Sequence, residues 1–518
     1  MNSPRFTIPD RHLVLRGSSD YKRGRRGILI PTRIARERGS HGTRVEALRS
    51  HRAQAADFDP GVPRNSFYPT EGKENPMSEE ITRRDFMKRA AVSTATTGLA
   101  IRGLSAKGVG ANDKIVVGVI GTGRMGLSNL EDFAKQPDVE IAAVCDVYQP
   151  NLEKGLKATD GKAKTYKDFR EVLDRKDINV AIVATPDHWH ALHTILACQA
   201  GKDVYVEKPI STTLEEGRRM VEAARKYNHV VQVGTQQRSG IHFQKAVQLV
   251  QDGFIGKVSF VRTWNYGNEY PEGIGNPTDS GPPSDLDWDL WLGPAPKVAF
   301  NLNRFGVGDR WSTFRYFWDY AGGYMTDWGV HLLDIVQWAM KVDGPHAVST
   351  FGGKFYLQDN AETPDTLQVT FEYPGFICTY ENRWANANSM YAKGYGIEFH
   401  GTEGTLFVDR SGFELHPEKR KVKSKTVDRT ATMQMAEVND SHFDHVRNFL
   451  DCVKSRQRPI SDIEIGHRST STCLLGNVAY RTKERITWDV ASQRLVQGGQ
   501  DAKKLLSRDY RPPWRLMV

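Results

Sequence analysis

The stretch KIVVGVIGTGRMG, residues 114–126, decides the fold. Its apolar run predicts a buried strand, and LSNLEDFAKQ (residues 127–136) predicts a helix directly after it. Between them, Gly121 allows a tight turn, Gly123 lets the backbone approach a pyrophosphate, and Gly126 brings the helix against the strand. The N–H groups at the start of such a helix favour anions. We therefore expect the phosphates of a dinucleotide to lie against Gly121, Thr122, Gly123, Arg124, Met125 and Gly126.

The acidic residue Asp146 indicates which dinucleotide is preferred. It ends a second predicted strand, VEIAAVCD (residues 139–146), and stands 25 residues after Gly121. A carboxylate at this place accepts hydrogen bonds from both ribose hydroxyls of NAD and repels the 2′-phosphate of NADP. The pattern favours NAD as the cofactor, with NADP as the alternative. A glycine turn in an unrelated α/β protein is the other interpretation that the motif leaves open.

Beyond this motif, strands and helices alternate as far as residue 234. The predicted units are residues 164–174, 178–201, 203–211 and 214–234. This alternation is typical of an α/β, Rossmann-type doubly wound parallel sheet, whose ligands bind beyond the carboxyl ends of the strands. Two segments at such ends carry polar side chains. We therefore expect cofactor contacts from Thr185, Pro186, His190, Glu207 and Lys208.

Three histidines in this region raise the alternative of a metal site. They are His188, His190 and His193. Because His188 and His190 point to different sides of the predicted helix and no cysteine lies nearby, we favour cofactor-lining or structural roles and predict no metal. The five cysteines of the chain are scattered and form no C-x-x-C pair, so a disulfide scaffold is not expected either.

The positive charge of the chain lies in its N-terminal region. The formal net charge is +9, yet residues 1–112 carry +10 and residues 113–518 carry −1. A basic groove for nucleic acid would have to lie on the folded body, so this distribution argues against a nucleic-acid partner. Because no run of about 18 apolar residues occurs, we expect no stable membrane insertion.

The N-terminal region has the composition of a leader and a signal. Residues 1–76 lack a sustained apolar period, so we expect a disordered or mis-assigned leader, with a basic binding tail as the alternative. In residues 77–111, the segment TRRDFMK (residues 82–88) and the mild apolar stretch after it resemble a twin-arginine export signal. We expect export, to a periplasm or otherwise, with a mature chain that begins near Asn112. Because this pathway carries folded proteins, the cofactor is expected to be loaded in the cytoplasm and held tightly.

After the Rossmann domain, placed at residues 112–234, the pattern becomes that of an α+β domain at residues 235–490, with a tail at residues 491–518. Short alternating runs between residues 351 and 417 predict an antiparallel sheet, and amphipathic helices near residues 442–455 and 468–483 are expected to pack back onto the body. Residues 268–296 form a long irregular segment, which favours a functional or interface loop.

Aromatic residues are concentrated after this irregular segment. Eight of the eighteen residues 311–328 are aromatic. One interpretation is core packing of a small domain. The other is a platform for a sugar, because aromatic faces suit the C–H groups of a pyranose while indole and phenol edges donate hydrogen bonds.

Four ordered motifs resemble those of the Gfo/Idh/MocA oxidoreductases, which include glucose-fructose oxidoreductase and inositol dehydrogenase. They are GTGRMG (residues 121–126), ATPDHWHA (184–191), VEKP (206–209) and GGYMTDWGVHLLD (322–334), and the resemblance covers residues 113–490. It implies Lys208, Asp327 and His331 as the catalytic group, and an open antiparallel sheet often used for homo-oligomer contacts. A branch of the superfamily that cleaves glycosides through transient oxidation departs at the lysine turn, whereas this chain keeps Lys208.

The spacing of Asp327 and His331 gives this group a chemical rationale. Residues 322–340 have a helical pattern, so the two side chains lie one turn apart on one face, where the carboxylate can orient the imidazole and stabilise its protonated form. A histidine with a pKa of about 6.5 can take the proton of an alcohol near neutral pH. Lys208 can hydrogen-bond the same oxygen and stabilise its developing charge.

The sequence thus predicts an exported NAD-dependent oxidoreductase that acts on a secondary hydroxyl of a sugar, sugar derivative or polyol. Candidate substrate contacts are Arg238, His242, Arg315, Trp328 and Asp334. Two alternatives remain open: a glycosidase of the same fold that oxidises its substrate only transiently, and a non-catalytic sugar or nucleotide sensor on a Rossmann scaffold.

Overall fold

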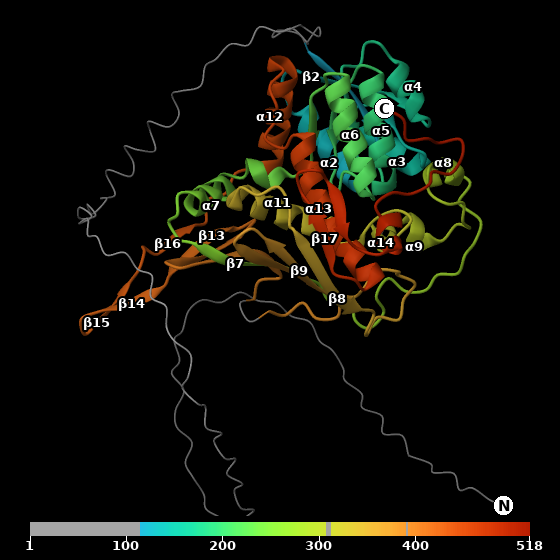
Figure 1. Ribbon diagram of the computed structural model, residues 1–518. Coiled ribbons are helices and arrows are strands. Elements are labelled where there is room, and N and C mark those ends of the chain that lie inside the picture. Colours follow the sequence, from blue (N-terminus) through green and yellow to red (C-terminus); the bar gives the residue numbers. More distant parts are fainter. Residues whose placement is uncertain (1–113, 307–311, 390–391) are drawn as a thin grey trace, which may run out of the picture. The chain divides into compact units, whose positions relative to one another are not determined.

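The computed structural model describes residues 114–306, 312–389 and 392–518. Its first sheet is parallel throughout, with the strand order β3-β2-β1-β4-β5-β6. The strands are β1 (Ile115–Ile120), β2 (Val139–Cys145), β3 (Lys164–Tyr166), β4 (Val180–Val183), β5 (Asp203–Val206) and β6 (Val231–Val233). The predicted doubly wound sheet is confirmed (Figure 1). Strand order reverses between β1 and β4, which is where ligands bind in such sheets.

Helices cover both faces of this sheet because its strands are apolar on both sides. They are α2 (Arg124–Ala134), α3 (Gln149–Ala158), α4 (Phe169–Asp174), α5 (Asp187–Gln199) and α6 (Leu214–Lys226). Val117 and Val119 of β1 share one core with α2 and α3, whereas Ala181 and Val183 of β4 share the other core with α4, α5 and α6.

A helix from the second half of the chain completes the first of these cores. Helix α12 (Ser441–Ser455) places Val446, Phe449 and Leu450 in it. The Phe449 ring lies 6.1 Å from Phe133 of α2 and 5.8 Å from Tyr205 of β5, measured between ring centroids. The expectation that this segment packs back onto the body is confirmed.

The second half of the chain builds a ten-stranded sheet with the order β16-β13-β12-β11-β7-β10-β9-β8-β17-β18. Its strands are β7 (Val258–Tyr266), β8 (Ala347–Gly353), β9 (Thr366–Tyr373), β10 (Phe376–Arg383), β11 (Tyr395–Gly401), β12 (Gly404–Asp409), β13 (Gly412–Pro417), β16 (Met433–Met435), β17 (Ile486–Asp489) and β18 (Arg494–Gln497). The antiparallel prediction needs one correction, because β7 and β10 pair in parallel. The long connection between these two strands allows both to run in the same direction.

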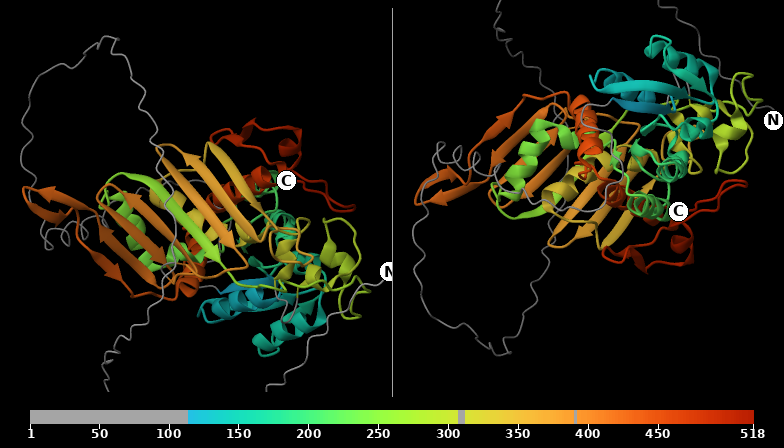
Figure 2. Two further views of the ribbon diagram at one scale, coloured as in Figure 1. Left: turned by 90° about the horizontal axis from the view of Figure 1, so that it is seen from below. Right: turned by 90° about the horizontal axis from the view of Figure 1, so that it is seen from above.

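Three helices cover one face of the ten-stranded sheet: α7 (Ile241–Gln251), α11 (Gly329–Met340) and α13 (Ile463–Thr482). Figure 2 shows the opposite face from below, with the strands in front of these helices. A two-stranded hairpin, β14 (Lys419–Val422) and β15 (Lys425–Asp428), extends beyond the sheet (Figure 1).

Short helices and loops lie before α7 and in the long connection between β7 and β8. The helix before α7 is η1 (Gln236–Ser239), and those after β7 are α8 (Trp288–Leu292), α9 (Leu302–Phe305), η3 (Thr313–Tyr316) and α10 (Gly323–Asp327). Of the aromatic cluster, Phe314, Phe317 and Tyr320 join a buried core with α8 and α9. Trp311 lies outside the described residues. Core packing therefore accounts for part of the aromatic cluster.

The C-terminal residues 491–518, expected to be a tail, are part of the folded body. They contain β18 and α14 (Gln500–Lys504), and the chain then returns to the Rossmann domain. Arg508 Nε donates to Glu216 Oε1 at 2.7 Å, and the Trp514 ring lies 4.8 Å from that of Trp189. These contacts join residues about 300 positions apart in sequence, so no local sequence pattern predicts them.

The predicted leader (residues 1–76) and twin-arginine signal (residues 77–111) lie outside the described residues. In the described part of the chain, no helix is both long and apolar enough to cross a membrane. The same residues contain no group of three or more His, Cys, Asp or Glu side chains that could hold a metal ion.

Candidate active site

A cavity of about 800 Å³ lies at the carboxyl ends of β1, β2, β4 and β5. Residues from both halves of the chain line it. The predicted cofactor contacts among them are Gly121, Gly123, Arg124, Met125, Asp146, Thr185, Pro186, His190, Glu207 and Lys208. Asp327, His331, Arg315 and Trp328 line it as well. The structure therefore brings most of the predicted site together, whereas Thr122, Gly126, Arg238, His242 and Asp334 are not among the residues described as lining the cavity.

The glycines shape one end of the cavity. Gly121 has φ of +90°, and a Cβ there would lie 2.7 Å from the Ala184 carbonyl oxygen. A Cβ on Gly126 would lie 1.9 Å from the Gly121 carbonyl oxygen, so only glycine permits this approach of helix to strand. At Gly123 the nearest atom to a Cβ is Asn151 Nδ2 at 3.8 Å. Gly126 thus serves packing, whereas Gly123 borders open space at the start of α2.

Asp146 follows β2 and lies beside this glycine turn. Its carboxylate accepts the Thr122 N–H at 2.8 Å and the Tyr148 N–H at 3.0 Å. Burial raises the pKa of Asp146, and these backbone hydrogen bonds oppose that rise. An open glycine cradle with a fixed carboxylate at its side fits the pyrophosphate and ribose of a dinucleotide.

The three histidines of α5 are engaged by protein groups. His190 has Nδ1 at 2.7 Å from the Pro209 carbonyl oxygen and Nε2 at 2.7 Å from that of Thr185. His188 Nε2 lies 3.0 Å from the Trp291 carbonyl oxygen. His190 therefore ties the turn after β4 to the Lys208-Pro209 turn, a framework role for a residue that also borders the cavity.

Lys208, Asp327 and Arg315 form an ion cluster at the other end of the cavity. Lys208 Nζ donates to Asp327 Oδ1 at 2.6 Å and to the Asp327 carbonyl oxygen at 2.9 Å. Arg315 Nε lies 3.0 Å from the same Oδ1. Burial alone would raise the pKa of Asp327, but Arg315 and Lys208 outweigh it and hold the pKa below its ordinary value. Asp327 is therefore a carboxylate that positions two cations.

His331 lies one turn after Asp327 and borders the cavity, but its side chain is only 5% exposed. Burial, together with the positive charges of Lys208 and Arg410, lowers the pKa of His331 well below its ordinary value. The prediction that Asp327 orients the imidazole needs correction, because its carboxylate binds Lys208 and Arg315 instead. A neutral imidazole is the form that accepts a proton.

Asp187, the first residue of α5, is a second buried carboxyl near this cluster. Burial raises the pKa of Asp187 to about 7, and the positive charge of Arg315 limits the rise. It belongs to the TPDHWH motif, but it is absent from the described lining of the cavity.

Three predicted substrate contacts lie elsewhere. Arg238 donates to both carboxylate oxygens of Asp334, at 2.7 and 3.0 Å, and both side chains are buried. His242 is buried beside Phe243. Within the described residues, none of these three borders the cavity. Asp327 ends α10, whereas Asp334 lies in the separate helix α11, about two turns further along, where Arg238 of η1 takes its carboxylate.

The site also contains Arg410, which sequence reasoning missed. Arg410 lies in the turn between β12 and β13, and its guanidinium carbon is 5.0 Å from the centre of the Trp328 ring. It borders the same cavity as His331. No sequence motif marks it, because only the pairing of β11, β12 and β13 carries this turn to the active site.

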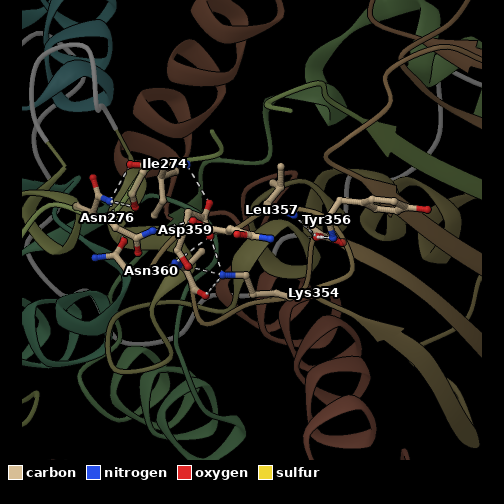
Figure 3. A network of polar contacts seen from close by, with 12 residues as sticks. Ile274, Asn276, Lys354, Tyr356, Leu357, Asp359 and Asn360 are labelled. Atoms are coloured by element: carbon tan, nitrogen blue, oxygen red, sulfur yellow. Dashed lines mark hydrogen bonds and ion pairs between the residues drawn. The ribbon is translucent and has the colours of Figure 1, made fainter. Parts of the chain in front are cut away.

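The irregular segment near Arg315 is held by a network of polar contacts (Figure 3). Lys354 Nζ donates to Asp359 Oδ1 at 2.7 Å, the Ile274 N–H donates to Asp359 Oδ2 at 2.9 Å, and Asn276 Nδ2 donates to the Gln358 carbonyl oxygen at 2.7 Å. The same loop reaches Tyr316, whose carbonyl oxygen accepts the Glu362 N–H at 2.8 Å. The network thus fixes the backbone next to Arg315.

Fold and site together define a two-domain protein in which one cavity joins a Rossmann dinucleotide cradle to an ion cluster formed by Lys208 of the first domain and Asp327 and Arg315 of the second. The family model described as "Oxidoreductase family, NAD-binding Rossmann fold" matches residues 115–235. Its companion, "Oxidoreductase family, C-terminal alpha/beta domain", matches residues 240–516, more than half of the chain. The chain belongs to the Gfo/Idh/MocA oxidoreductase family.

Several individual proteins are also similar to this chain, at modest sequence identity. A myo-inositol 2-dehydrogenase of Thermotoga maritima is 24% identical over 383 residues, which are 71% of this chain and 96% of that protein. A glycosyl hydrolase family 109 protein of Shewanella baltica is 30% identical over 203 residues, or 34% of this chain and 44% of that protein. The chain thus matches less than half the length of this relative. A solved levoglucosan dehydrogenase in complex with NADH and levoglucosan has a TM-score of 0.55 at 17% identity, covering 72% of this chain and 99% of its own.

Proposed function

We propose that the protein is an NAD-dependent oxidoreductase that oxidises a secondary hydroxyl of a sugar, sugar derivative or polyol. The observation that carries this proposal is the junction of two sites in one cavity: a glycine cradle at one end, and Lys208 with the neutral His331 at the other. Family membership and the named activities of the myo-inositol and levoglucosan dehydrogenases support it.

The residues of the cluster have distinct roles in this reaction. Asp327 holds the Lys208 ammonium in place, and Lys208 hydrogen-bonds the substrate oxygen and stabilises the negative charge that develops there. His331, neutral because of burial and nearby cations, takes the hydroxyl proton as general base. NAD, when bound along the glycine cradle and Asp146, supplies the hydride acceptor.

The proposal is tested with purified protein and a panel of sugars and polyols, following NADH absorbance and products together. Lys208→Met and His331→Ala are expected to lower turnover on the order of a hundredfold or more, the usual contribution of a positioned general base. NADH binding, measured by fluorescence, is expected to persist. Lys421→Met and His416→Ala are matched controls because both residues are exposed on the far strands β14 and β13. Unchanged turnover in either site variant would place the chemistry elsewhere.

A redox-assisted glycosidase is the second candidate, favoured by the glycosyl hydrolase family 109 names among relatives that match about a third of the chain, 34% and 37% of it. In that reaction the substrate is oxidised transiently, the leaving group is eliminated, and the hydride returns. The panel therefore includes aryl glycosides. Release of the aryl alcohol without net NADH would favour the glycosidase, whereas stoichiometric NADH would favour the dehydrogenase.

We also propose export through the twin-arginine pathway and retention of a tightly bound cofactor. The support is the TRRDFMK segment (residues 82–88), together with the scarcity of free NAD outside the cytoplasm. Retention requires that the cofactor be reoxidised in place, by a second sugar or by the same substrate. Protein purified without added nucleotide is expected to release nicotinamide cofactor on denaturation. Peptides from residues 5–64 in exported protein would contradict a mature chain that begins near Asn112.

Homo-oligomerisation through the ten-stranded sheet is a further part of the proposal. On the face opposite the helices, Ile377 is 43% and Phe351 73% exposed, and Phe260 pairs with Ile377 across β7 and β10. Exposed apolar side chains on one sheet face favour a protein interface. Sedimentation should show a dimer or larger species that Ile377→Asp weakens, while Val422→Asp on the hairpin leaves it intact.

A further inference from the structure

The substrate end of the cavity carries more positive than negative charge. Among the described lining residues, Lys208, Arg315 and Arg410 are cationic there, against Glu207 and Asp327. Lys208 and Arg315 share the Asp327 carboxylate. Glu207 is engaged by the Asn129 amide, which donates to its Oε1 at 3.0 Å. Of the three cations, Arg410 is the one that takes part in none of these contacts.

The nearest acidic neighbour in sequence does not neutralise Arg410. Asp409 directs its carboxylate to Lys393 Nζ at 3.1 Å and to the Ser411 N–H at 2.8 Å. Within the described part of the chain, Arg410 has no ion pair with any carboxylate. Its side chain is exposed to the cavity, so its charge is available to a bound molecule.

The position of Arg410 is nevertheless fixed. Its backbone N–H donates to Tyr395 Oη at 2.6 Å, and its guanidinium lies over the Trp328 ring. Tyr395 and Trp328 also contact each other, with ring centroids 5.0 Å apart. Trp328 in turn lies edge-on to His331, at 6.1 Å between ring centroids. An arginine stacked on an indole keeps its planar fork of donors available for a carboxylate or phosphate.

We infer that Arg410 selects substrates that carry an anionic group, a carboxylate or a phosphate, in addition to the hydroxyl that is oxidised. The inference rests on the proposed function for the identity of that hydroxyl. One indole separates the anion contact from the general base, so a single sugar acid or sugar phosphate can meet both. Neutral sugars leave the Arg410 charge without a partner and bind less well.

The test uses substrates of the same ring stereochemistry that differ at C6, and the acid and its methyl ester form the pair that differs mainly in charge. In each of the gluco, galacto and manno series, the neutral hexose, the uronic acid, its methyl ester and the hexose 6-phosphate are compared. The first readout is kcat/KM from NADH formation, and the second is binding to the NAD-loaded protein by calorimetry. In at least one series, the acid or the phosphate is expected to exceed the neutral hexose and the ester on the order of 10- to 100-fold, the range of a charged hydrogen bond.

Variants then locate the effect. Arg410→Gln should reduce the acid-to-ester ratio to about one, in the range expected when a charged contact is lost, and Arg410→Lys should restore part of it because the charge remains without the fork. Arg420→Gln, at an exposed arginine of β14, should keep the wild-type ratio. Equal use of acid and ester by the wild type, equal binding of the two, or an unchanged ratio in Arg410→Gln would overturn the inference. If acids bind through Arg410 while no compound reduces NAD, the proposed function fails and the inference stands.

Discussion

Replacing Gly123 with alanine separates cofactor binding from folding. The backbone at Gly123, with φ of −66° and ψ of −173°, suits any residue, and the added methyl group would meet no protein atom closer than 3.8 Å. We therefore expect the free energy of unfolding to change by no more than about 0.5 kcal/mol. The methyl group instead enters the cavity, at the start of helix α2, where the pyrophosphate is expected.

The loss of NAD affinity follows from that position. Displacing one phosphate oxygen from a backbone N–H removes a charge-assisted hydrogen bond, which contributes about 1.5 to 3 kcal/mol. This corresponds to about 10- to 150-fold weaker binding. The assay is titration of NADH fluorescence, with urea unfolding of the same preparations.

Two further alanine variants serve as controls. At Gly281, nothing lies within 4 Å of the added Cβ, so neither stability nor binding should change. At Gly126, the Cβ would lie 1.9 Å from the Gly121 carbonyl oxygen, so helix and strand must separate and stability should fall by about 3 kcal/mol or more. If Gly123→Ala binds NADH as tightly as the wild type, or loses stability as Gly126→Ala does, the dinucleotide does not lie along this cradle.

Three other variants test electrostatic assignments. Asp334→Asn leaves Arg238 buried without its counter-charge, so the free energy of unfolding should fall by about 3 to 5 kcal/mol and the urea midpoint should drop. The KM for the sugar should stay unchanged. A higher KM at wild-type stability would return Asp334 to the substrate site. Burial raises the pKa of Asp187 to about 7, so the folded state keeps a proton that the unfolded carboxyl loses near pH 4. The free energy of unfolding should therefore fall as pH rises between about 4 and 7. Asp187→Asn should flatten that slope. Asp146→Ser should shift binding from NADH toward NADPH by removing repulsion of the 2′-phosphate, and wild-type protein that binds NADPH tenfold tighter, about 1.4 kcal/mol, would contradict this.

Local patterns were sufficient for the Rossmann half. The strand before Gly121, the glycine spacing and the acid at the end of β2 are each set by neighbouring residues, and in parallel sheets all such strand ends meet at one edge. The cofactor end of the cavity therefore follows from the order of residues along the chain. Thr122 and Gly126 are the two predicted phosphate contacts that do not border the cavity, because Thr122 is buried and Gly126 packs against the Gly121 carbonyl group.

Charge partners required the tertiary structure. The i, i+4 spacing places Asp327 near His331, but it says nothing about Lys208 and Arg315, which arrive from other segments and take the carboxylate because a cation binds it more strongly than a neutral imidazole. Likewise, Arg238 and Asp334 neutralise each other across 96 residues of sequence.

The sequence by itself thus determined the parallel sheet, the dinucleotide cradle and fourteen of the residues that border the cavity, because these depend largely on short-range spacing. Only the tertiary structure decided that residues 491–518 close against α5 and α6, that β7 and β10 run in parallel, and that Arg410 lies over Trp328 and borders the same cavity as His331. Each of these depends on which distant strands and side chains meet, and that is settled by packing and charge balance over the whole fold.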